Sequence, residues 1–198
     1  MLTIYHLENS RSERIIWLCE ELGLQYELKK YPRENGMAGA AYKALHPLGR
    51  APIIHDGDVT LIESGAIIDY LLTRYGQGRL VPKADSAEYP RYVQFLHFAE
   101  GSAMQHLIMA MVLSMSGQGD MPFLDERIKQ DFAFMNEALA GGSYFAGKDF
   151  TGADINLAFV LKFARDFMKR DVGSLANITA YLTRIEARPA FKKAMSLA

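Results

Sequence analysis

Cysteine is almost absent from the 198-residue sequence, since Cys19 is the only one. A disulfide within the chain is therefore impossible, and a zinc site built from cysteines is excluded. No hydrophobic run reaches the roughly 18 residues that a membrane helix needs. The N-terminal residues also lack the charged segment and apolar stretch of a signal peptide. We therefore expect no membrane partner and a cytoplasmic protein in a reducing environment.

An excess of one charge is missing as well. The 22 lysines and arginines against 23 aspartates and glutamates leave a net charge of -1. Charge therefore provides no reason to expect a nucleic-acid partner. The five histidines contain no i, i+4 pair, and we expect no metal site. Hydrophobic residues make up 49% of the chain, which is enough for the core of one large domain or two small ones.

Short strand-like and helix-like segments alternate in the first 78 residues. The expected strands are 2–7, 26–30, 51–55 and 59–62, and the expected helices are 12–22, 37–45 and 64–75. Asp56-Gly57-Asp58 is a hairpin signal between the last two strands. The βαβαββα order predicts an α/β fold, in which helices cover a small mixed sheet.

The second half of the sequence has a different rhythm. Residues 76–85 contain two glycines and Pro82, and we interpret them as a linker. The helices expected beyond it are 92–115, 124–139, 151–169, 178–187 and a last segment that runs to 198. We therefore predict an α/β domain over residues 1–78 and an all-helical (all-α) domain over residues 86–198.

Two helix starts carry a polar pair at the spacing of a capping box. Thr151 and Asp154 form one pair, which we interpret as a folding signal without chemistry. Ser10 and Glu13 form the other. Ser10 either only caps its helix or also holds a ligand, because backbone N–H groups and the helix dipole favour a bound anion there.

A thiolate is an anion that suits Ser10. A free thiol with a pKa near 8.5 is only about 3% ionised at pH 7. Lowering that pKa by about 2 units requires about 2.7 kcal/mol of differential stabilisation. A hydroxyl that donates to sulfur, together with a helix N-terminus, can supply a free energy of this size.

A second polar pair, Glu63-Ser64, opens the helix expected at 64–75. Ser64 can cap that helix while Glu63 points into solvent. Alternatively, Ser64 binds a ligand carboxylate and Glu63 takes the ligand's ammonium group. The two interpretations are compatible. Pro52 lies where a strand begins, and an Ala51-Pro52 bond can adopt the cis form.

The sequence as a whole resembles the cytosolic glutathione S-transferase family, of the bacterial serine type. The motifs that carry the resemblance are RSERIIWLCEELGL, a Gly-Arg-Ala-Pro turn, a hairpin, and LIESGAIIDYL. The resemblance covers essentially the whole chain. It implies a thioredoxin-like N-terminal domain, an all-helical C-terminal domain and a homodimer.

The resemblance implies a role for two of these segments. Ser10 lies four residues before Arg14, where the serine-type classes keep the serine that activates the thiol. Ala51 and Pro52 match the pair at the cis-proline, where the backbone of the first residue pairs with the cysteinyl part of glutathione.

Further positions match the groups that hold the ends of glutathione. Glu63 and Ser64 match the pair that binds the γ-glutamyl end, and Arg50 matches a basic residue that reaches the glycyl carboxylate. Arg11 and Arg33 are extra cations with less support.

Tyr5 is an alternative to Ser10 as the activating residue. It lies near the end of the first expected strand, as the activating tyrosine does in the tyrosine-type classes. We favour Ser10. Because Ser10 stands where cysteine-type members have a cysteine, we expect no disulfide exchange through an enzyme thiol. Cys19 falls on the apolar face of its helix and is expected to be buried and inert.

The function implied is a glutathione transferase in detoxification. It would activate the thiol of its co-substrate glutathione as a thiolate, for conjugation to apolar electrophiles at the helical domain. One alternative is a glutathione-dependent isomerase, dehalogenase or peroxidase on the same fold. Another is a non-catalytic adaptor. Four methionines of the expected helix 92–115 form either a soft core or an adaptable wall for the electrophile: Met104, Met109, Met111 and Met115.

Overall fold

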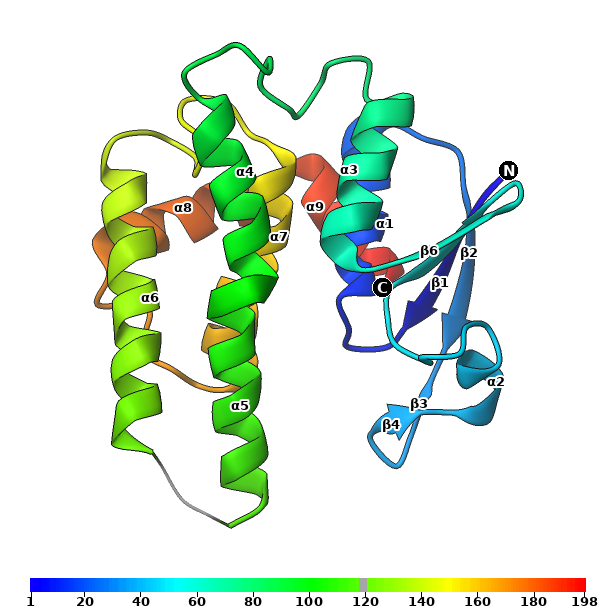
Figure 1. Ribbon diagram of the computed structural model, residues 1–198, viewed down its shortest axis with the longest axis horizontal. Coiled ribbons are helices and arrows are strands. Elements are labelled where there is room, and N and C mark those ends of the chain that lie inside the picture. The colour runs from blue at the N-terminus through cyan, green and yellow to red at the C-terminus, as the bar shows by residue number, and fades with distance from the viewer. Residues whose placement is uncertain (118–120) are drawn as a thin grey trace. The chain divides into compact units, whose positions relative to one another are not determined.

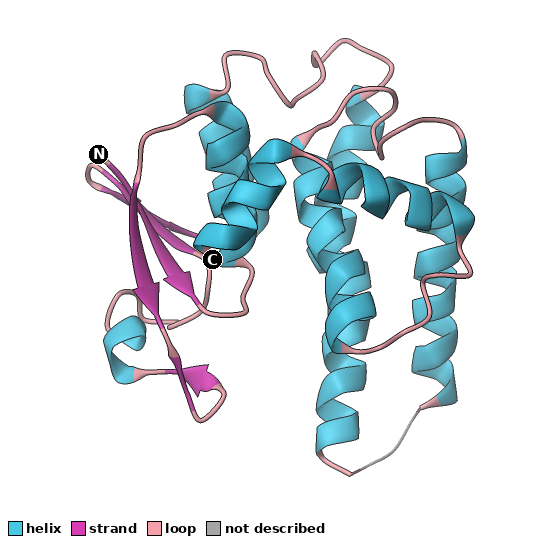
Figure 2. Ribbon diagram, turned by 180° about the vertical axis from the view of Figure 1, so that it is seen from behind, coloured by secondary structure: helices cyan, strands magenta, loops and turns pink. Residues whose placement is uncertain are grey.

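The computed structural model describes residues 1–117 and 121–198 (Figures 1 and 2). Contacts divide the chain into two units. The first comprises Met1–Arg79 and Glu186–Ala198, and the second comprises Leu80–Ile185. Residues 186–198 thus group with the first unit, although the predicted helical domain includes them. The predicted domain boundaries at residues 78 and 86 stay a prediction.

The first unit is built on a mixed sheet with the strand order β2-β1-β5-β6. β1 and β2 are parallel, and the pairs β1–β5 and β5–β6 are antiparallel. The strands are β1 (Leu2–Leu7), β2 (Glu27–Tyr31), β5 (Ile53–Asp56) and β6 (Val59–Ile62). The helices are α1 (Ser12–Leu22), α2 (Ala40–Lys43), α3 (Ser64–Tyr75) and α9 (Pro189–Leu197). The predicted thioredoxin-like fold is confirmed.

A small hairpin is the main element that the predicted order lacks. It joins β3 (Arg33–Glu34) to β4 (Met37–Ala38), and strands of two residues are too short to show a periodic pattern. Asn35 and Gly36 turn the chain with φ of 50° and 78°. This Asn-Gly pair is the usual sequence of a tight hairpin turn. The helix predicted at 37–45 is correspondingly shorter, because α2 begins only at Ala40.

The two faces of the sheet are covered by different helices. Side chains alternate between the faces along a strand, so His6 points away from Tyr5 and Leu7. His6 contacts Ser12 of α1, whereas Tyr5 and Leu7 pack with Tyr42 of α2. α1 and α2 therefore lie on opposite faces of the sheet.

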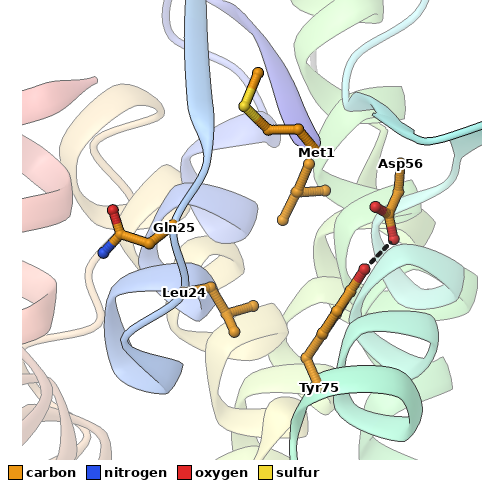
Figure 3. A pocket seen from close by; sticks show the side chains of 6 residues that line it. Met1, Leu24, Gln25, Asp56 and Tyr75 are labelled. Carbon is orange, nitrogen blue, oxygen red and sulfur yellow. Dashed lines mark hydrogen bonds between the residues drawn. The ribbon is translucent and has the colours of Figure 1, made fainter.

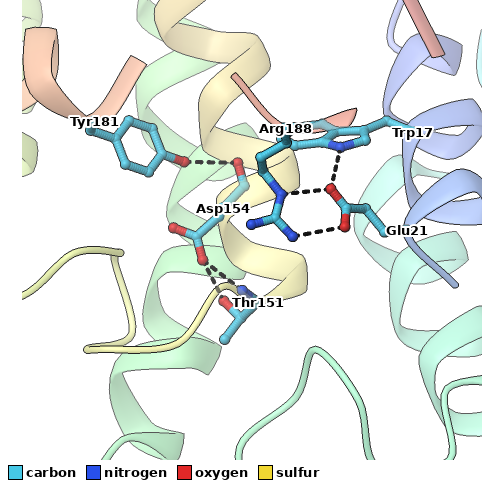
Figure 4. A network of polar contacts seen from close by, with 6 residues as sticks. All are labelled: Trp17, Glu21, Thr151, Asp154, Tyr181 and Arg188. Carbon is cyan, nitrogen blue, oxygen red and sulfur yellow. Dashed lines mark hydrogen bonds and ion pairs between the residues drawn. The ribbon is translucent and has the colours of Figure 1, made fainter. Parts of the chain in front are cut away.

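Helix α9 returns from the end of the chain to pack on α1. The ring of Phe191 meets the edge of Trp17 at 5.0 Å between centroids. Two nitrogens of Arg188 contact the two carboxylate oxygens of Glu21, each at 2.7 Å (Figure 4). Trp17 donates from its indole nitrogen to the same carboxylate. The final helix thus completes the core of the first unit.

The described part of the second unit is helical, which confirms the predicted all-helical region. Its α-helices are α4 (Tyr89–Phe98), α5 (Met104–Met115), α6 (Pro122–Ala140), α7 (Gly152–Lys162) and α8 (Ala176–Glu186). Two π-helical segments, η1 (Ala99–Ala103) and η2 (Phe163–Phe167), follow α4 and α7 without a break. The predicted helices at 92–115 and 151–169 are therefore each continuous but locally widened.

The start of α7 has the predicted capping box. Asp154 is fully buried and accepts hydrogen bonds from the backbone N–H of Thr151 at 2.8 Å and of Phe145 at 3.0 Å. The hydroxyl of Thr151 donates to the same carboxylate (Figure 4). In return, the Thr151 side chain accepts the backbone N–H of Asp154. Burial raises the pKa of Asp154 to about 6 despite these donors.

Candidate functional site

The start of α1 differs from the predicted capping box. Arg11 is the N-cap residue, and no side chain caps the helix there. The hydroxyl oxygen of Ser10 instead lies 2.7 Å from the hydroxyl oxygen of Ser12 and accepts the Ser12 backbone N–H at 3.3 Å. The prediction that Ser10 and Glu13 form a capping box was wrong, because the Ser10 side chain pairs with Ser12. Ser10 lies just before the N-terminus of α1 and is only 7% exposed.

Arg33 holds the loop that carries Ser10. Its guanidinium donates to the carbonyl oxygens of Glu8 at 2.8 Å, Asn9 at 2.9 Å and Gly36 at 3.0 Å. Asn9 has a φ of 49°, which is uncommon for a residue other than glycine. Arg33, which was predicted as an extra cation for a ligand, thus fixes the backbone beside Ser10.

Tyr5 lies on the opposite face of the sheet from His6 and Ser12. Its hydroxyl is 2.9 Å from Nδ1 of His55, and its ring meets the His55 ring edge-on. The side chain is 7% exposed. A hydroxyl engaged in this way, on the α2 face, is poorly placed to donate to a ligand at the start of α1.

Cys19 is a free cysteine with a fully buried side chain. Burial raises the pKa of its thiol well above the usual range, and the charge of Glu20 adds to the effect. The predicted burial is confirmed. A thiol that is buried and protonated at neutral pH is not a nucleophile.

The start of α3 is strained and polar. Glu63, not Ser64 as one interpretation had it, is the N-cap residue, and it has a φ of 69° and a ψ of 115°. Such backbone strain is concentrated at functional sites in proteins. Ser64 is buried, and its oxygen accepts a hydrogen bond from Nη1 of the buried Arg14 at 2.8 Å. The carboxylate-bearing Glu63 remains exposed to solvent.

The turn before β5 contains a cis peptide bond between Ala51 and Pro52, as the sequence allowed. Among the turn, loop and cap hydrogen bonds of the described residues, none uses the backbone N–H or C=O of Ala51. Arg50 is exposed. An extended peptide would therefore find an unused backbone donor and acceptor here, next to a cation.

The topology of the sheet brings three segments together. β1 ends at Leu7. β5 is antiparallel to β1, so its first residue, Ile53, lies at the same end of the sheet. Ile62, the last residue of β6, pairs with Ile53. The segments that follow β1, precede β5 and follow β6 therefore share one end of the sheet.

These three segments carry all of the favoured site residues, namely Ser10, Arg50, Ala51, Pro52, Glu63 and Ser64. The hydrogen bond from Arg14 to Ser64 joins the starts of α1 and α3 directly. In the sequence, Arg14 served only to locate Ser10, and nothing pointed to Ser12 and His6, which form a hydrogen-bonded chain to Ser10. Their contacts come from folding, and no local motif announces them.

A cavity of about 320 Å³ lies elsewhere in the first unit (Figure 3). It is lined by Met1, Leu2, Leu24, Gln25, Asp56 and Tyr75. Because Leu2 pairs with Asp56, this cavity is at the other end of the sheet, and no predicted site residue lines it. Burial disfavours ionisation of Asp56, but hydrogen bonds from Tyr75 and Tyr70, together with the charges of Arg74 and the N-terminus, outweigh it and lower the pKa of that carboxyl.

The described residues contain no cluster of three or more His, Cys, Asp or Glu side chains that could hold a metal ion. Within the same ranges, no helix has the length and apolar character to cross a membrane.

Two family models match the chain. The glutathione S-transferase N-terminal domain matches residues 1–73, and the glutathione S-transferase C-terminal domain matches residues 103–189. Glutathione S-transferase 3 of Schizosaccharomyces pombe is 35% identical over 96% of this chain and 85% of its own length. Glutathione S-transferase 1 of Saccharomyces cerevisiae is 28% identical over 83% of this chain and 81% of its own length.

Solved structures of similar proteins extend this result. A glutathione S-transferase of Actinobacillus pleuropneumoniae superposes with a TM-score of 0.91 and 35% identity, covering 100% of this chain and 92% of its own. A glutathione transferase homologue of Lodderomyces elongisporus, solved with two GSH per subunit, has a TM-score of 0.84 and 20% identity over 99% of this chain and 98% of its own. The second likeness, at this identity, concerns the fold alone.

Proposed function

The chain belongs to the glutathione S-transferase family, and from this premise we propose that Ser10 stabilises the thiolate of bound glutathione for attack on an apolar electrophile. The observation that carries the proposal is the meeting of three polar segments at one end of the sheet, with the buried hydroxyls of Ser10 and Ser64 among them.

Ser64 and Glu63 would bind the γ-glutamyl end of the ligand. The Ser64 oxygen accepts a hydrogen bond from Arg14. A serine hydroxyl is both a donor and an acceptor, so it can also donate to a ligand carboxylate. The N-terminus of α3 adds a favourable dipole for that carboxylate. The exposed carboxylate of Glu63 lies beside it and suits the ligand's ammonium group.

Ala51 and Arg50 would bind the rest of the tripeptide. The backbone N–H and C=O of Ala51 can pair with the cysteinyl residue, as one strand pairs with another. The exposed guanidinium of Arg50 can reach the glycyl carboxylate. These contacts would aim the sulfur at the start of α1, where Ser10 lies.

The reaction needs a thiolate and the correct placement of two reactants. One charge-assisted hydrogen bond contributes about 1.5–3 kcal/mol, and a helix N-terminus about 0.3–1 kcal/mol. Together they can lower a thiol pKa by about 2 units. The thiolate would then attack an electrophilic carbon held beside it, with placement providing much of the acceleration.

The electrophile is proposed to be apolar because the helical unit offers flexible apolar side chains. Met109 and Met115 on α5 are 46% and 80% exposed, so these two do not belong to the buried core that was one prediction. Met104 alone of the four is fully buried, at 1% exposure. Methionine surfaces adapt to ligands of different shape. A homodimeric, cytoplasmic protein acting in detoxification is part of the same proposal.

The thiol pKa of bound glutathione tests the role of Ser10. We expect Ser10→Ala to raise that pKa, measured by thiolate absorbance, by about 1 unit or more, and to lower kcat/KM for chlorodinitrobenzene by roughly 10- to 100-fold. Tyr5→Phe is the matched control and should leave the pKa unchanged. An unaltered pKa in Ser10→Ala, together with a raised one in Tyr5→Phe, would transfer the role to Tyr5.

Calorimetry with glutathione separates an enzyme from an adaptor of the same fold. We expect glutathione to bind with a Kd in the millimolar range or below. Ser64→Ala should raise this Kd by about 10-fold, since a charge-assisted hydrogen bond is lost. No binding heat at millimolar glutathione, with no turnover of chlorodinitrobenzene, would favour the adaptor.

A further inference from the structure

Three buried polar groups form a chain that ends at Ser10. Nδ1 of His6 lies 2.8 Å from the hydroxyl oxygen of Ser12, and that oxygen lies 2.7 Å from the hydroxyl oxygen of Ser10. His6 is 1% exposed and Ser12 is 0% exposed. The chain thus links the end of β1, through the first residue of α1, to the hydroxyl that is proposed to face sulfur.

The protons along the short contacts of this chain, at 2.7 and 2.8 Å, can be arranged in two directions. In the outward direction, Nδ1–H of His6 donates to Ser12, Ser12 donates to Ser10, and Ser10 keeps its own proton for a ligand. In the inward direction, Ser10 donates to Ser12 and Ser12 donates to Nδ1. Ser10 would then present only lone pairs, which repel a thiolate.

The surroundings of His6 favour the outward direction. Its Nε2 is buried, and among the described residues no group forms a hydrogen bond with it. A neutral imidazole carries one proton, and orphaned buried N–H groups are rare in proteins. Placing the proton on Nδ1 gives the N–H a partner in Ser12, so that only a lone pair stays unpaired.

The imidazole also remains neutral in the working range of pH. Burial lowers the pKa of His6 to about 4, and the neighbouring charge of Lys30 on β2 acts in the same sense, whereas Glu8 after β1 opposes it. The imidazole is therefore neutral near pH 7, where it carries a single proton. The Ser12 hydroxyl can also donate to the Leu7 carbonyl oxygen, but that contact, at 3.4 Å, is much longer than the 2.7 Å contact with Ser10, which therefore takes the proton.

We propose that His6 is a positioning residue, which acts through Ser12 to keep the hydroxyl proton of Ser10 directed outward, toward the sulfur of bound glutathione. This inference rests on the proposed function of Ser10. Two lone pairs of the Ser10 oxygen are then used by Ser12, one by its hydroxyl and one by its backbone N–H. The proton that remains is then available to the ligand.

The tautomer of His6 can be measured without any ligand. Long-range ¹H–¹⁵N NMR spectra of the histidine ring distinguish a protonated Nδ1 from a protonated Nε2. We expect His6 to carry its proton on Nδ1 at pH 7. A proton on Nε2 would overturn the inference, whatever the role of Ser10.

The thiol pKa of bound glutathione provides the functional test. We expect His6→Leu to raise it by about 0.5–1 unit and to lower kcat by roughly 3- to 10-fold, with little change in KM for glutathione. His6→Asn keeps a donor near the position of Nδ1 and should restore most of the loss. Ser12→Ala, which breaks the chain without changing the imidazole, should reproduce the effect of His6→Leu if that variant does not fold.

A double-mutant cycle separates the two levels of the proposal. In the Ser10→Ala background, His6→Leu should cause no further rise of the thiol pKa. An effect of Ser10→Ala without an effect of His6→Leu or Ser12→Ala would refute the positioning role alone. A Ser10→Ala enzyme with an unaltered thiol pKa would refute the proposed function itself.

Discussion

The starts of α1 and α7 have similar sequences and different structures. Each has a hydroxyl residue followed three positions later by an acid, Ser10 with Glu13 and Thr151 with Asp154. At α7 both partners are buried, and their polar atoms bond to each other and to nearby backbone. At α1 the helix begins without a side-chain cap, and Ser10 turns to Ser12 instead.

The difference shows how a helix start can be devoted to folding or kept for a ligand. At α7 the hydroxyl of Thr151 donates its proton to the carboxylate of Asp154 at 2.8 Å, so this hydroxyl has no proton to donate to a ligand. At α1 the Ser10 oxygen accepts two hydrogen bonds from Ser12 in the outward arrangement. The Ser10 hydroxyl can then donate its own proton to a ligand. Mutations at the two starts should therefore affect different properties.

The largest expected effect on stability belongs to Asp154. Asp154→Ala leaves the buried N–H groups of Thr151 and Phe145 without their acceptor. Each unsatisfied buried group costs about 1–3 kcal/mol, so we expect a loss of about 3 kcal/mol in the free energy of unfolding, measured with urea. Glu13→Ala is the matched control at α1, with an expected loss of less than about 1 kcal/mol. Equal losses of stability in Asp154→Ala and Glu13→Ala would show that the two helix starts do not differ in their contribution to folding.

The pH dependence of stability should also differ between the two starts. The pKa of Asp154 is raised to about 6, so the folded state binds a proton that the unfolded state has released above about pH 4. The stability from this group is therefore full below about pH 4 and is lost as the pH rises to about 6. Asp154→Asn should remove this part of the unfolding profile, while Glu13→Gln should retain it. An identical profile in wild type and Asp154→Asn would contradict the raised pKa.

The smallest expected effects come from the two hydroxyls. Thr151→Ala should lower the free energy of unfolding by about 1–2 kcal/mol, and Thr151→Ser should restore most of it. Ser10→Ala should cost less, about 1 kcal/mol. It removes two hydrogen bonds with Ser12, but the one from the Ser12 backbone N–H is long, at 3.3 Å. Parallel thermal melts and activity assays measure both. A Ser10→Ala protein as destabilised as Thr151→Ala would make Ser10 a structural cap.

Elements with a strong local pattern could be predicted from the sequence to the residue. The bounds of β1, β6, α1 and α3 agree with those expected. α1 ends where Gly23 adopts a left-handed φ of 66°, a conformation that glycine tolerates best. Periodicity and punctuation residues are sufficient for such helices because both act within a few residues.

The candidate site could be predicted only in part. Motifs indicated Ser10, Glu63 and Ser64. However, the pairs that begin at residues 10 and 151 have the same spacing, so the sequence predicted a capping box at both, and only the second one forms. The contacts that separate the two cases join residues far apart in sequence, such as Arg14 and Ser64, 50 positions apart. Such contacts depend on strand order and burial, and no local pattern encodes them.

The packing of α9 on α1 has a consequence for the order of biosynthesis. Residues 1–79 emerge from the ribosome long before Arg188 and Phe191, the partners of Glu21 and Trp17, are synthesised. The side of α1 that carries Trp17 and Glu21 therefore stays uncovered in the nascent chain until the entire helical unit has been translated. The part of the polypeptide that is made first is completed last.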